Sequence, residues 1–233
     1  MAKNKKAVVL LSGGLDSATT LYYALDKGYK CQALIFDYGQ RHKRELRSAV
    51  AVAKGAKVPY QILKIKLPWK GSSLLDTSSP IPHTSHLRKI GENIPSTYVP
   101  ARNTIFLSFA LSCAEATGAQ AIFIGANAID FSGYPDCRPA YYKAFQKVIE
   151  QGTKARKIRI ITPLIKLTKE QIIRLGMKLG APLEKTWSCY AGGKKPCGVC
   201  DSCLLRQKGF AAIGHGEFDG RRKKRIVVKV MGE

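Results

Sequence analysis

The chain has 233 residues, with 39 Lys and Arg against 16 Asp and Glu, so its formal net charge is +23 at pH 7. A hydrophobic fraction of 45% is ordinary for a folded globular protein with one sizeable core. The apolar run at 7–11 is too short for a signal peptide, and no window approaches the ~20 apolar residues of a membrane span. We therefore expect a cytoplasmic protein.

The first third of the chain alternates strands and helices. Short apolar runs at 7–11, 31–36 and 60–65 predict buried strands. Helical apolar spacing at 17–27 and 41–54 predicts the helices between them. This β-α-β-α-β order predicts an α/β fold with a parallel, doubly wound, Rossmann-like sheet.

The next segment, 68–100, is rich in Pro, Ser, Thr, Gly and His and predicts a long loop, which we interpret as a lid. Thr168 is the expected N-cap of a later helix. We divide the chain into an α/β domain at 1–184 and a small C-terminal segment at 185–233. The remaining predicted elements are helices at 104–117, 140–150, 169–179 and 202–212, strands at 121–124 and 158–161, and an apolar tail at 226–230.

The first predicted strand runs into Ser-Gly-Gly-Leu-Asp-Ser at 12–17, directly before a helix. Gly13 and Gly14 allow a left-handed backbone and let phosphate oxygens approach closely. The helix presents free N–H groups and the positive end of its dipole to an anion. A plain turn that ends a strand and caps a helix is the alternative. The candidate ATP-binding residues are Leu11, Ser12, Gly13, Gly14, Leu15, Asp16 and Ser17.

Asp16 is the unusual member of this loop, because a bare carboxylate repels phosphate. It fits if Mg²⁺ bridges it to the nucleotide, or if it caps the free N–H groups of the helix. The loop lacks the Gly-Lys-Ser/Thr ending of a Walker A loop and resembles the pyrophosphatase loop of the N-type ATP pyrophosphatases. That resemblance implies a fold like that of the adenine-nucleotide α-hydrolases. It also implies cleavage of ATP between its α- and β-phosphates and an adenylated intermediate.

Four of the seven cysteines fall close together, separated by seven, two and two residues. Four thiolates supply the closed tetrahedral shell of a structural zinc ion, and Gly198 permits the tight turn between them. An iron–sulfur cluster takes the same number of thiolates, and redox or disulfide chemistry is a third interpretation. We predict zinc, with Lys194 and Lys195 offsetting its negative shell. The predicted ligands are Cys189, Cys197, Cys200 and Cys203.

Two further segments carry side chains suited to a substrate. In the segment at 98–103, Arg102 suits a carboxylate or phosphate and Asn103 suits an amide or ring edge. The segment at 125–138 concentrates acids, an arginine and aromatic rings, which suits a flat polar heterocycle. A surface turn with stray charges is the alternative for the second segment. The candidate substrate-binding residues are Tyr98, Arg102, Asn103, Asp130, Tyr134, Asp136 and Arg138.

Four segments in order, 12–17, 98–103, 125–138 and 186–190, closely resemble the 7-cyano-7-deazaguanine synthase family, and the similarity spans 7–210. The resemblance implies a ligase that forms C–N bonds. Its substrates would be 7-carboxy-7-deazaguanine, ATP and free ammonia, and its product a nitrile formed through an acyl-adenylate and an amide. Such a product serves the biosynthesis of queuosine or archaeosine.

The resemblance also implies roles for particular residues. Asp16, Ser17, Arg102 and Arg138 would act in catalysis, and Lys43 would serve with Arg102 as an electrostatic clamp on the substrates. Mg²⁺ would accompany ATP. The protein would form a homodimer.

Two other functions stay open at this level. A tRNA-modifying member of the same superfamily would explain the net charge of +23, although the segment at 125–138 argues against it. A zinc-knuckle RNA-binding module would read RNA with 189–203 and hold it with the basic run at 221–225, but it leaves the predicted sheet without a purpose. We interpret the charge as binding of small anions on a lysine-rich background, without direct nucleic-acid binding. The basic run keeps no assigned role.

Overall fold

The computed structural model describes residues 5–82, 94–129 and 133–214, and the predicted tail at 226–230 lies outside them. Its centre is a parallel sheet of five strands in the order β3-β2-β1-β4-β5. The chain reverses its direction of winding between β1 and β4, so these neighbours form the topological switch point. The predicted doubly wound sheet is therefore confirmed. The strands are β1 (Lys6–Leu10), β2 (Lys30–Asp37), β3 (Tyr60–Lys64), β4 (Ala121–Phe123) and β5 (Arg159–Ile161).

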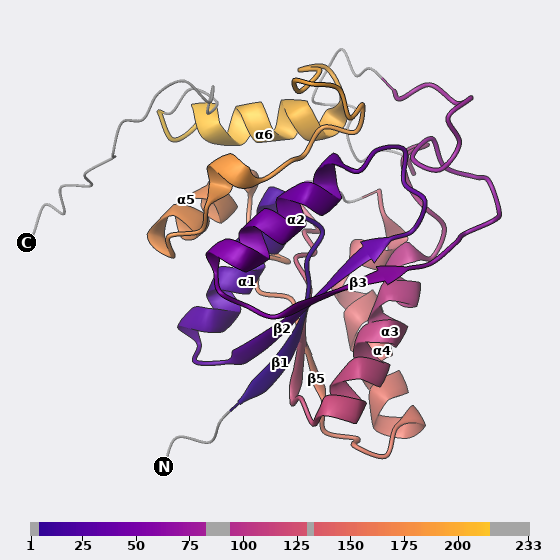
Figure 1. Cartoon of the computed structure of the whole chain (residues 1–233), viewed down its shortest axis with the longest axis vertical. Coiled ribbons are helices and arrows are strands. Elements are labelled where there is room, and N and C mark those ends of the chain that lie inside the picture. Colours follow the sequence, from indigo (N-terminus) through magenta and orange to yellow (C-terminus); the bar gives the residue numbers. More distant parts are fainter. Residues whose placement is uncertain (1–4, 83–93, 130–132, 215–233) are drawn as a thin grey trace, which may run out of the picture.

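Helices cover both faces of the sheet (Figure 1). Two of them, α1 and α2, lie on one face, and α3 and α4 lie on the other. The helices are α1 (Leu15–Asp26), α2 (Arg44–Gly55), α3 (Arg102–Thr117), α4 (Pro139–Gly152), α5 (Lys169–Lys178) and α6 (Asp201–Ala211), with short 3-10 turns η2 (Pro135–Cys137) and η3 (Leu183–Lys185).

The central strand β1 shows why the sequence there is almost continuously apolar. Val8 and Leu10 point into the core under α3 and α4, whereas Ala7 and Val9 point into the core under α1 and α2. Successive side chains of a strand face opposite sides, and both sides of this strand are buried. A polar residue at any of these positions would lose its contact with water.

Helices α5 and α6 pack beside α1 and form a third layer. A separate apolar cluster joins Leu15 of α1 to Ile172 and Ile173 of α5 and Phe210 of α6. A Cβ on Gly209 would lie 2.7 Å from the Ile173 side chain, so α6 crosses α5 at very close range. Helix α6 lies after residue 184 but packs on α5, which lies before it. This packing does not separate two units at residue 184, so the division of the chain there stays a prediction.

Local signals account for where several helices begin. Thr168 caps α5 as predicted: its hydroxyl accepts a hydrogen bond from the Gln171 backbone, and the Gln171 side chain accepts one from the Thr168 backbone. Helix α1 begins at Leu15, earlier than expected, so the end of the Ser-Gly-Gly-Leu-Asp-Ser loop is already helical. Helix α3 begins directly after Ala101, whose φ of 52° is left-handed.

The described parts of the long loop, 68–82 and 94–100, form neither strand nor helix, as predicted, and fold back onto the protein. Arg41 holds this loop because its guanidinium donates hydrogen bonds to the carbonyls of Ser73, Thr77 and Ser79 at 2.7–3.2 Å. Among the described residues, no helix is long and apolar enough to cross a membrane.

Candidate active site

A cavity of about 240 Å³ lies at the carboxyl edge of the sheet, at the switch point between β1 and β4. The loops after β1, β2 and β4 line it, together with the start of α3, the segment at 186–190 and side chains from α5 and α6. Open α/β sheets bind their ligands at this position. Segments separated by as much as 190 residues thus meet around one space.

We call the Ser-Gly-Gly-Leu-Asp-Ser loop at 12–17 the phosphate loop, after its predicted ligand. Close packing as well as backbone conformation requires its glycine at 13, and a glycine at 125 beside it. Gly13 has a φ of 86°, and a Cβ there would overlap the backbone of Glu45 and Ala49 in α2. Gly125, after β4, approaches equally closely from the other side: a Cβ on it would lie 2.9 Å from the backbone of Asp16 and Ser17. The loop is therefore tightly packed between α2 and the residue after β4.

Hydrogen bonds within the loop fix its two serines. The Ser12 and Ser17 hydroxyls lie 3.0 Å apart, and the Ser17 hydroxyl also donates to the Gly14 carbonyl. Gly14 is the N-cap of α1, and no side chain among the described residues caps that helix. Residues 14–17, at the start of α1, line the cavity, as expected for an anion site at a helix N-terminus.

Asp16 makes a contact that the sequence did not predict. Its carboxylate accepts two hydrogen bonds, of 2.8 and 2.9 Å, from the ammonium of Lys169 at the start of α5. The interpretation of Asp16 as the helix cap is therefore wrong. Lys169 is buried and lines the cavity, so it adds a positive charge beside the phosphate loop. A lysine in the first turn of a distant helix carries no local sequence signal for this role.

Arg102 enters the cavity from the start of α3, as predicted. Its guanidinium donates to the Tyr38 hydroxyl at 3.0 Å and lies over the same ring, 5.7 Å from its centre. Burial by itself would lower the pKa of Arg102, but Tyr38, Tyr134 and Glu45 outweigh burial and raise it. Arg102 is therefore a permanent positive charge available to an anionic substrate.

Glu45 also lines this cavity and was not predicted as a site residue. It lies in the first turn of α2, shortly after the loop that follows β2. Burial raises its pKa to about 7, in spite of the opposing effect of Arg102. A carboxyl group with such a pKa exchanges protons readily near neutral pH. Its one sequence signal is its place shortly after the predicted strand at 31–36.

Asn103 and Asp136 support each other. The Asp136 carboxylate accepts a hydrogen bond from the Asn103 backbone, and the Asn103 side chain donates to the Asp136 carbonyl, both at 3.2 Å. The Tyr142 hydroxyl donates to the same carbonyl at 2.9 Å. Asp136 is buried in this network, so its geometry fits the positioning of Asn103 at the cavity wall.

The other predicted substrate residues divide between the cavity and its surroundings. Tyr134 lines the cavity and its hydroxyl lies 2.8 Å from that of Thr97 in the long loop. Tyr98 packs against the Tyr134 ring behind the wall. Arg138 is exposed before α4, and the exposed Lys43 pairs with Asp37 at 3.0 Å, so neither faces this cavity. Asp130 lies outside the described residues.

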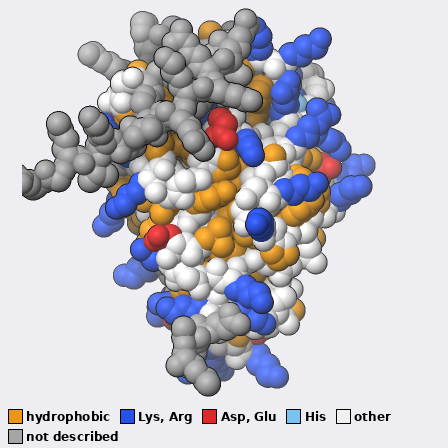
Figure 2. Space-filling view, turned by 60° about the vertical axis from the view of Figure 1, so that its left-hand side comes forward, with side chains coloured by type: hydrophobic (Ala, Val, Ile, Leu, Met, Phe, Trp, Pro, Cys, Tyr) orange, Lys and Arg blue, Asp and Glu red, His pale blue; other side chains and the backbone are white. Residues whose placement is uncertain are grey.

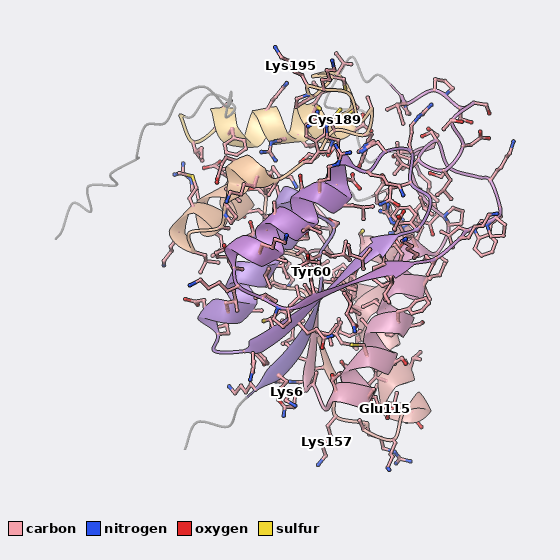
Figure 3. All side chains as sticks on the ribbon, in the orientation of Figure 1. Lys6, Tyr60, Glu115, Lys157, Cys189 and Lys195 are labelled. Atoms are coloured by element: carbon pink, nitrogen blue, oxygen red, sulfur yellow. The ribbon has the colours of Figure 1, made fainter. Side chains whose placement is uncertain are left out.

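The four predicted metal-binding cysteines come together as expected. Their sulfur atoms all lie within 4.8 Å of one another, and three of the four residues are buried. A tetrahedral shell with metal–sulfur bonds of about 2.3 Å places its sulfurs about 3.8 Å apart, so the donor set fits a four-thiolate metal site. Figure 3 shows Cys189 at the end of the molecule opposite Lys6, the first residue of β1, which places the cluster beyond the carboxyl edge.

The segment at 186–190 connects this cluster to the cavity. The backbone N–H of Trp187 donates to the Gly13 carbonyl at 2.9 Å. Arg206 of α6 donates to the side chains of Thr186 and Ser188 at 2.8 and 3.3 Å. The buried Arg206 was not predicted, because its partners lie about 20 residues away in sequence.

Comparison with known proteins covers nearly the whole chain. Residues 6–214 match the family described as queuosine biosynthesis protein QueC. A protein from Nostoc punctiforme named 7-cyano-7-deazaguanine synthase is 54% identical over 215 residues, which cover 90% of this chain and 96% of the relative. A protein of the same name from Thermoplasma acidophilum is 55% identical over 215 residues, which cover 91% and 90%. The matched region thus includes the sheet, the cavity and the four cysteines.

Among solved structures, NMN synthetase from Francisella tularensis superposes with a TM-score of 0.49 at 18% identity. The alignment covers 91% of this chain and 79% of that chain.

Replacing Lys169 by Met is expected to weaken nucleotide binding. The change removes the positive charge that offsets Asp16, so that carboxylate would face the phosphates of a nucleotide uncompensated. We expect the Kd of a non-hydrolysable ATP analogue, measured by isothermal titration calorimetry, to rise about 10-fold or more. Lys166→Met, an exposed change of equal size three residues earlier, is the control. Equal affinity in both variants would contradict this role.

Replacing Glu45 by Gln is expected to change the pH dependence of stability. Because the folded-state pKa of about 7 exceeds the ordinary value of 4.5, ionisation disfavours folding, and wild-type stability falls as the pH rises between these values. Gln does not ionise. The free energy of unfolding of the variant relative to wild type should therefore increase by about 2 kcal/mol from pH 5 to pH 8 in urea titrations.

The surface variant Glu170→Gln serves as the control for this experiment, since Glu170 forms only a half-exposed ion pair with Arg174 on α5. If the free energy of unfolding of Glu45→Gln differs from that of wild type by the same amount at pH 5 and at pH 8, Glu45 has an ordinary pKa.

Proposed function

This chain belongs to the family described as queuosine biosynthesis protein QueC, and from that membership we propose that it converts 7-carboxy-7-deazaguanine and ammonia into 7-cyano-7-deazaguanine with ATP. Relatives with 54–55% identity over about nine-tenths of the chain carry the name of that activity. The proposed enzyme is a ligase that forms a C–N bond. Its product would serve the biosynthesis of queuosine or a related deazaguanine nucleoside.

One observation supports the proposal: a single cavity is lined by the candidate phosphate loop, by the cation Arg102 and by Asn103 and Tyr134. ATP would lie with its phosphates at the N-terminus of α1, where Ser12, Gly14 and Ser17 contribute donors. Lys169 would shift its ammonium from Asp16 toward the phosphates. Arg102 would hold the carboxylate of the substrate, which must approach the α-phosphate.

The first half of the reaction activates the acid. A carboxylate oxygen attacks the α-phosphorus of ATP, the bond to the bridging oxygen of the β-phosphate breaks, and pyrophosphate leaves. Ammonia then attacks the acyl carbon. The nitrogen loses one proton, and AMP departs with the former carboxylate oxygen, leaving the amide.

The second half dehydrates the amide with another ATP. The amide oxygen attacks the α-phosphorus and pyrophosphate leaves again. Loss of the two nitrogen protons and of AMP, which carries the amide oxygen away, leaves the C≡N group. Protons are thus released from nitrogen in both halves. Glu45 lines the cavity with a pKa of about 7, which suits it to accept them.

The heterocycle would bind against the wall made by Asn103 and Tyr134. In this proposal Asp136 keeps Asn103 in place and Tyr98 supports the Tyr134 ring. Asp130 and Arg138 remain proposed substrate residues that belong to the same segment. The contribution of Arg138 requires that its exposed side chain approaches the cavity when substrate binds.

The proposed metals have separate roles. Zinc at Cys189, Cys197, Cys200 and Cys203 would be structural, since four thiolates leave no position for a substrate. Mg²⁺ bound with ATP would offset phosphate charge. Asp16 could ligate it only by releasing Lys169, which ties the arrival of the ion to the movement of the lysine.

We also propose a cytoplasmic homodimer that acts on small molecules and not directly on RNA. Figure 2 shows Lys and Arg side chains scattered over the visible face, with apolar surface between them, and not gathered into one stripe. An electrostatic footprint for a nucleic acid is expected to be continuous. The name 7-cyano-7-deazaguanine synthase carried by close relatives supports small anions as the ligands over a tRNA-modifying function.

The activity is tested by incubating the protein with 7-carboxy-7-deazaguanine, ATP, Mg²⁺ and ammonium chloride, with mass spectrometry of the products. We expect the nitrile together with two AMP for each nitrile formed. Asp16→Ala should reduce the yield at least 100-fold, a loss of about 3 kcal/mol of transition-state stabilisation. An undiminished nitrile yield in this variant would contradict the role of the phosphate loop, and an unchanged carboxylate with wild type would contradict the function.

Metal content provides a separate test. We expect one zinc per chain in the purified protein by inductively coupled plasma mass spectrometry, and a clear loss of zinc in Cys203→Ser, because three thiolates bind the ion more weakly. Cys113→Ser, outside the cluster, should retain the full content. Iron in place of zinc would replace this assignment by an iron–sulfur cluster.

A further inference from the structure

Trp187 makes hydrogen bonds to both functional sites. Its backbone N–H donates to the carbonyl of Gly13 in the phosphate loop at 2.9 Å. Its indole N–H donates to the carbonyl of Cys189, a residue of the cysteine cluster, at 2.8 Å. The side chain also packs against that cluster. A single residue therefore joins the backbone of a predicted metal ligand to the backbone that would hold phosphate.

Arg206 fixes the same segment from the other side. Helix α6 begins at the cluster, since Cys200 is its N-cap and Cys203 lies in its first turn. Arg206 follows Cys203 by one helical turn, so it moves with that cysteine as part of one rigid element. Its buried guanidinium donates to Thr186 and Ser188, the neighbours of Trp187, and to the Leu183 carbonyl at 3.1 Å.

A third contact closes the arrangement on the α2 side. The Arg44 guanidinium lies 4.7 Å from the centre of the Trp187 ring and donates to the Lys194 carbonyl, inside the cysteine loop, at 2.9 Å. The next residue, Glu45, has its backbone against Gly13. The cysteine loop thus contacts α2 and Trp187, and each of these also contacts Gly13.

We infer that occupancy of the four-cysteine site and binding of ATP are thermodynamically coupled through Trp187 and Arg206, so that each ligand strengthens the binding of the other. A metal bound by Cys189 and Cys203 would restrict Cys189, which Trp187 contacts, and Cys203, which lies one turn before Arg206. The phosphate loop would then have less conformational entropy to lose when ATP binds. Linkage requires the reverse effect to be of equal size. Trp187 and Arg206 are positioning residues in this view. The inference rests on the proposed use of ATP.

The test measures metal release and needs no catalysis. Zinc-loaded protein is mixed with an excess of a chromophoric chelator, with Mg²⁺ present, in the absence and presence of saturating α,β-methylene-ATP. We expect the nucleotide to slow zinc release by wild type about 5- to 10-fold, within the usual range of coupling between sites. A release rate that does not change with nucleotide would overturn the inference.

Two variants identify the route. Trp187→Phe keeps an aromatic ring but removes the indole donor to Cys189, and Arg206→Lys keeps the charge but cannot reach three acceptors at once. Both should bind zinc in full and retain the wild-type circular dichroism spectrum. At nucleotide concentrations that saturate each variant, the slowing should fall below 2-fold. Lys208→Met, an exposed change on the same helix, should behave as wild type.

The outcomes separate this inference from the proposed function. If wild type does not bind the ATP analogue in calorimetry, the proposed function fails and the coupling fails with it. If the analogue binds and zinc release stays unchanged, only the coupling fails. If the nucleotide slows zinc release from both variants as much as from wild type, the inferred coupling through Trp187 and Arg206 is wrong. At equilibrium, the factor by which the analogue lowers the Kd of zinc in chelator competition must equal the factor by which zinc lowers the Kd of the analogue.

Discussion

The close packing of backbones around the phosphate loop is the constraint on which the rest of the structure depends. Gly13 lies against α2 and Gly125 lies against the start of α1, each without room for a Cβ. The Trp187 N–H completes the enclosure by binding the Gly13 carbonyl. These contacts come from three distant parts of the chain. Once they form, the positions of α1, α2 and the C-terminal layer relative to the sheet are largely determined.

Charged groups inside the cavity are balanced by neighbouring side chains. Asp16 is paired with Lys169, while Arg102 is surrounded by phenol groups and by a carboxyl group that burial keeps partly protonated. Unpaired charges buried in a protein are costly, so each group has a partner in the free enzyme. In the proposed function, anionic substrates would replace these partners without leaving a buried charge alone. On the face shown in Figure 2, the lysines and arginines at the surface are scattered.

Much of the fold follows from local pattern. The apolar runs of β1, β2 and β4 predict buried parallel strands, and the alternation of period 2 and period 3.6 predicts the helices between them within a few residues. The largest error in a predicted helix start is at α2, which was expected from 41 and begins at Arg44. Helices α1 and α3 each begin two residues earlier than expected, within segments that line the cavity. In the site, the phosphate loop, Arg102, Asn103 and the four cysteines were identified because dense motifs mark them. Lys169, Glu45 and Arg206 were missed because each is a single charged residue on an ordinary helix.

The sequence by itself determined the fold class, the candidate phosphate loop and the four cysteines of the cluster, since each depends on residues that are neighbours along the chain. Only the tertiary structure decided which charges meet: it turned Asp16 from a possible helix cap into the partner of Lys169, 153 positions away. It placed Arg102 in the cavity and left Arg138 at the surface. The physical reason is that spacing along the chain specifies turns and helix faces, whereas the pairing of distant side chains depends on how the layers pack. The phosphate loop is an example of both cases. Its glycines can be recognised in the sequence, whereas the α2 backbone that packs against Gly13 is known only from the structure.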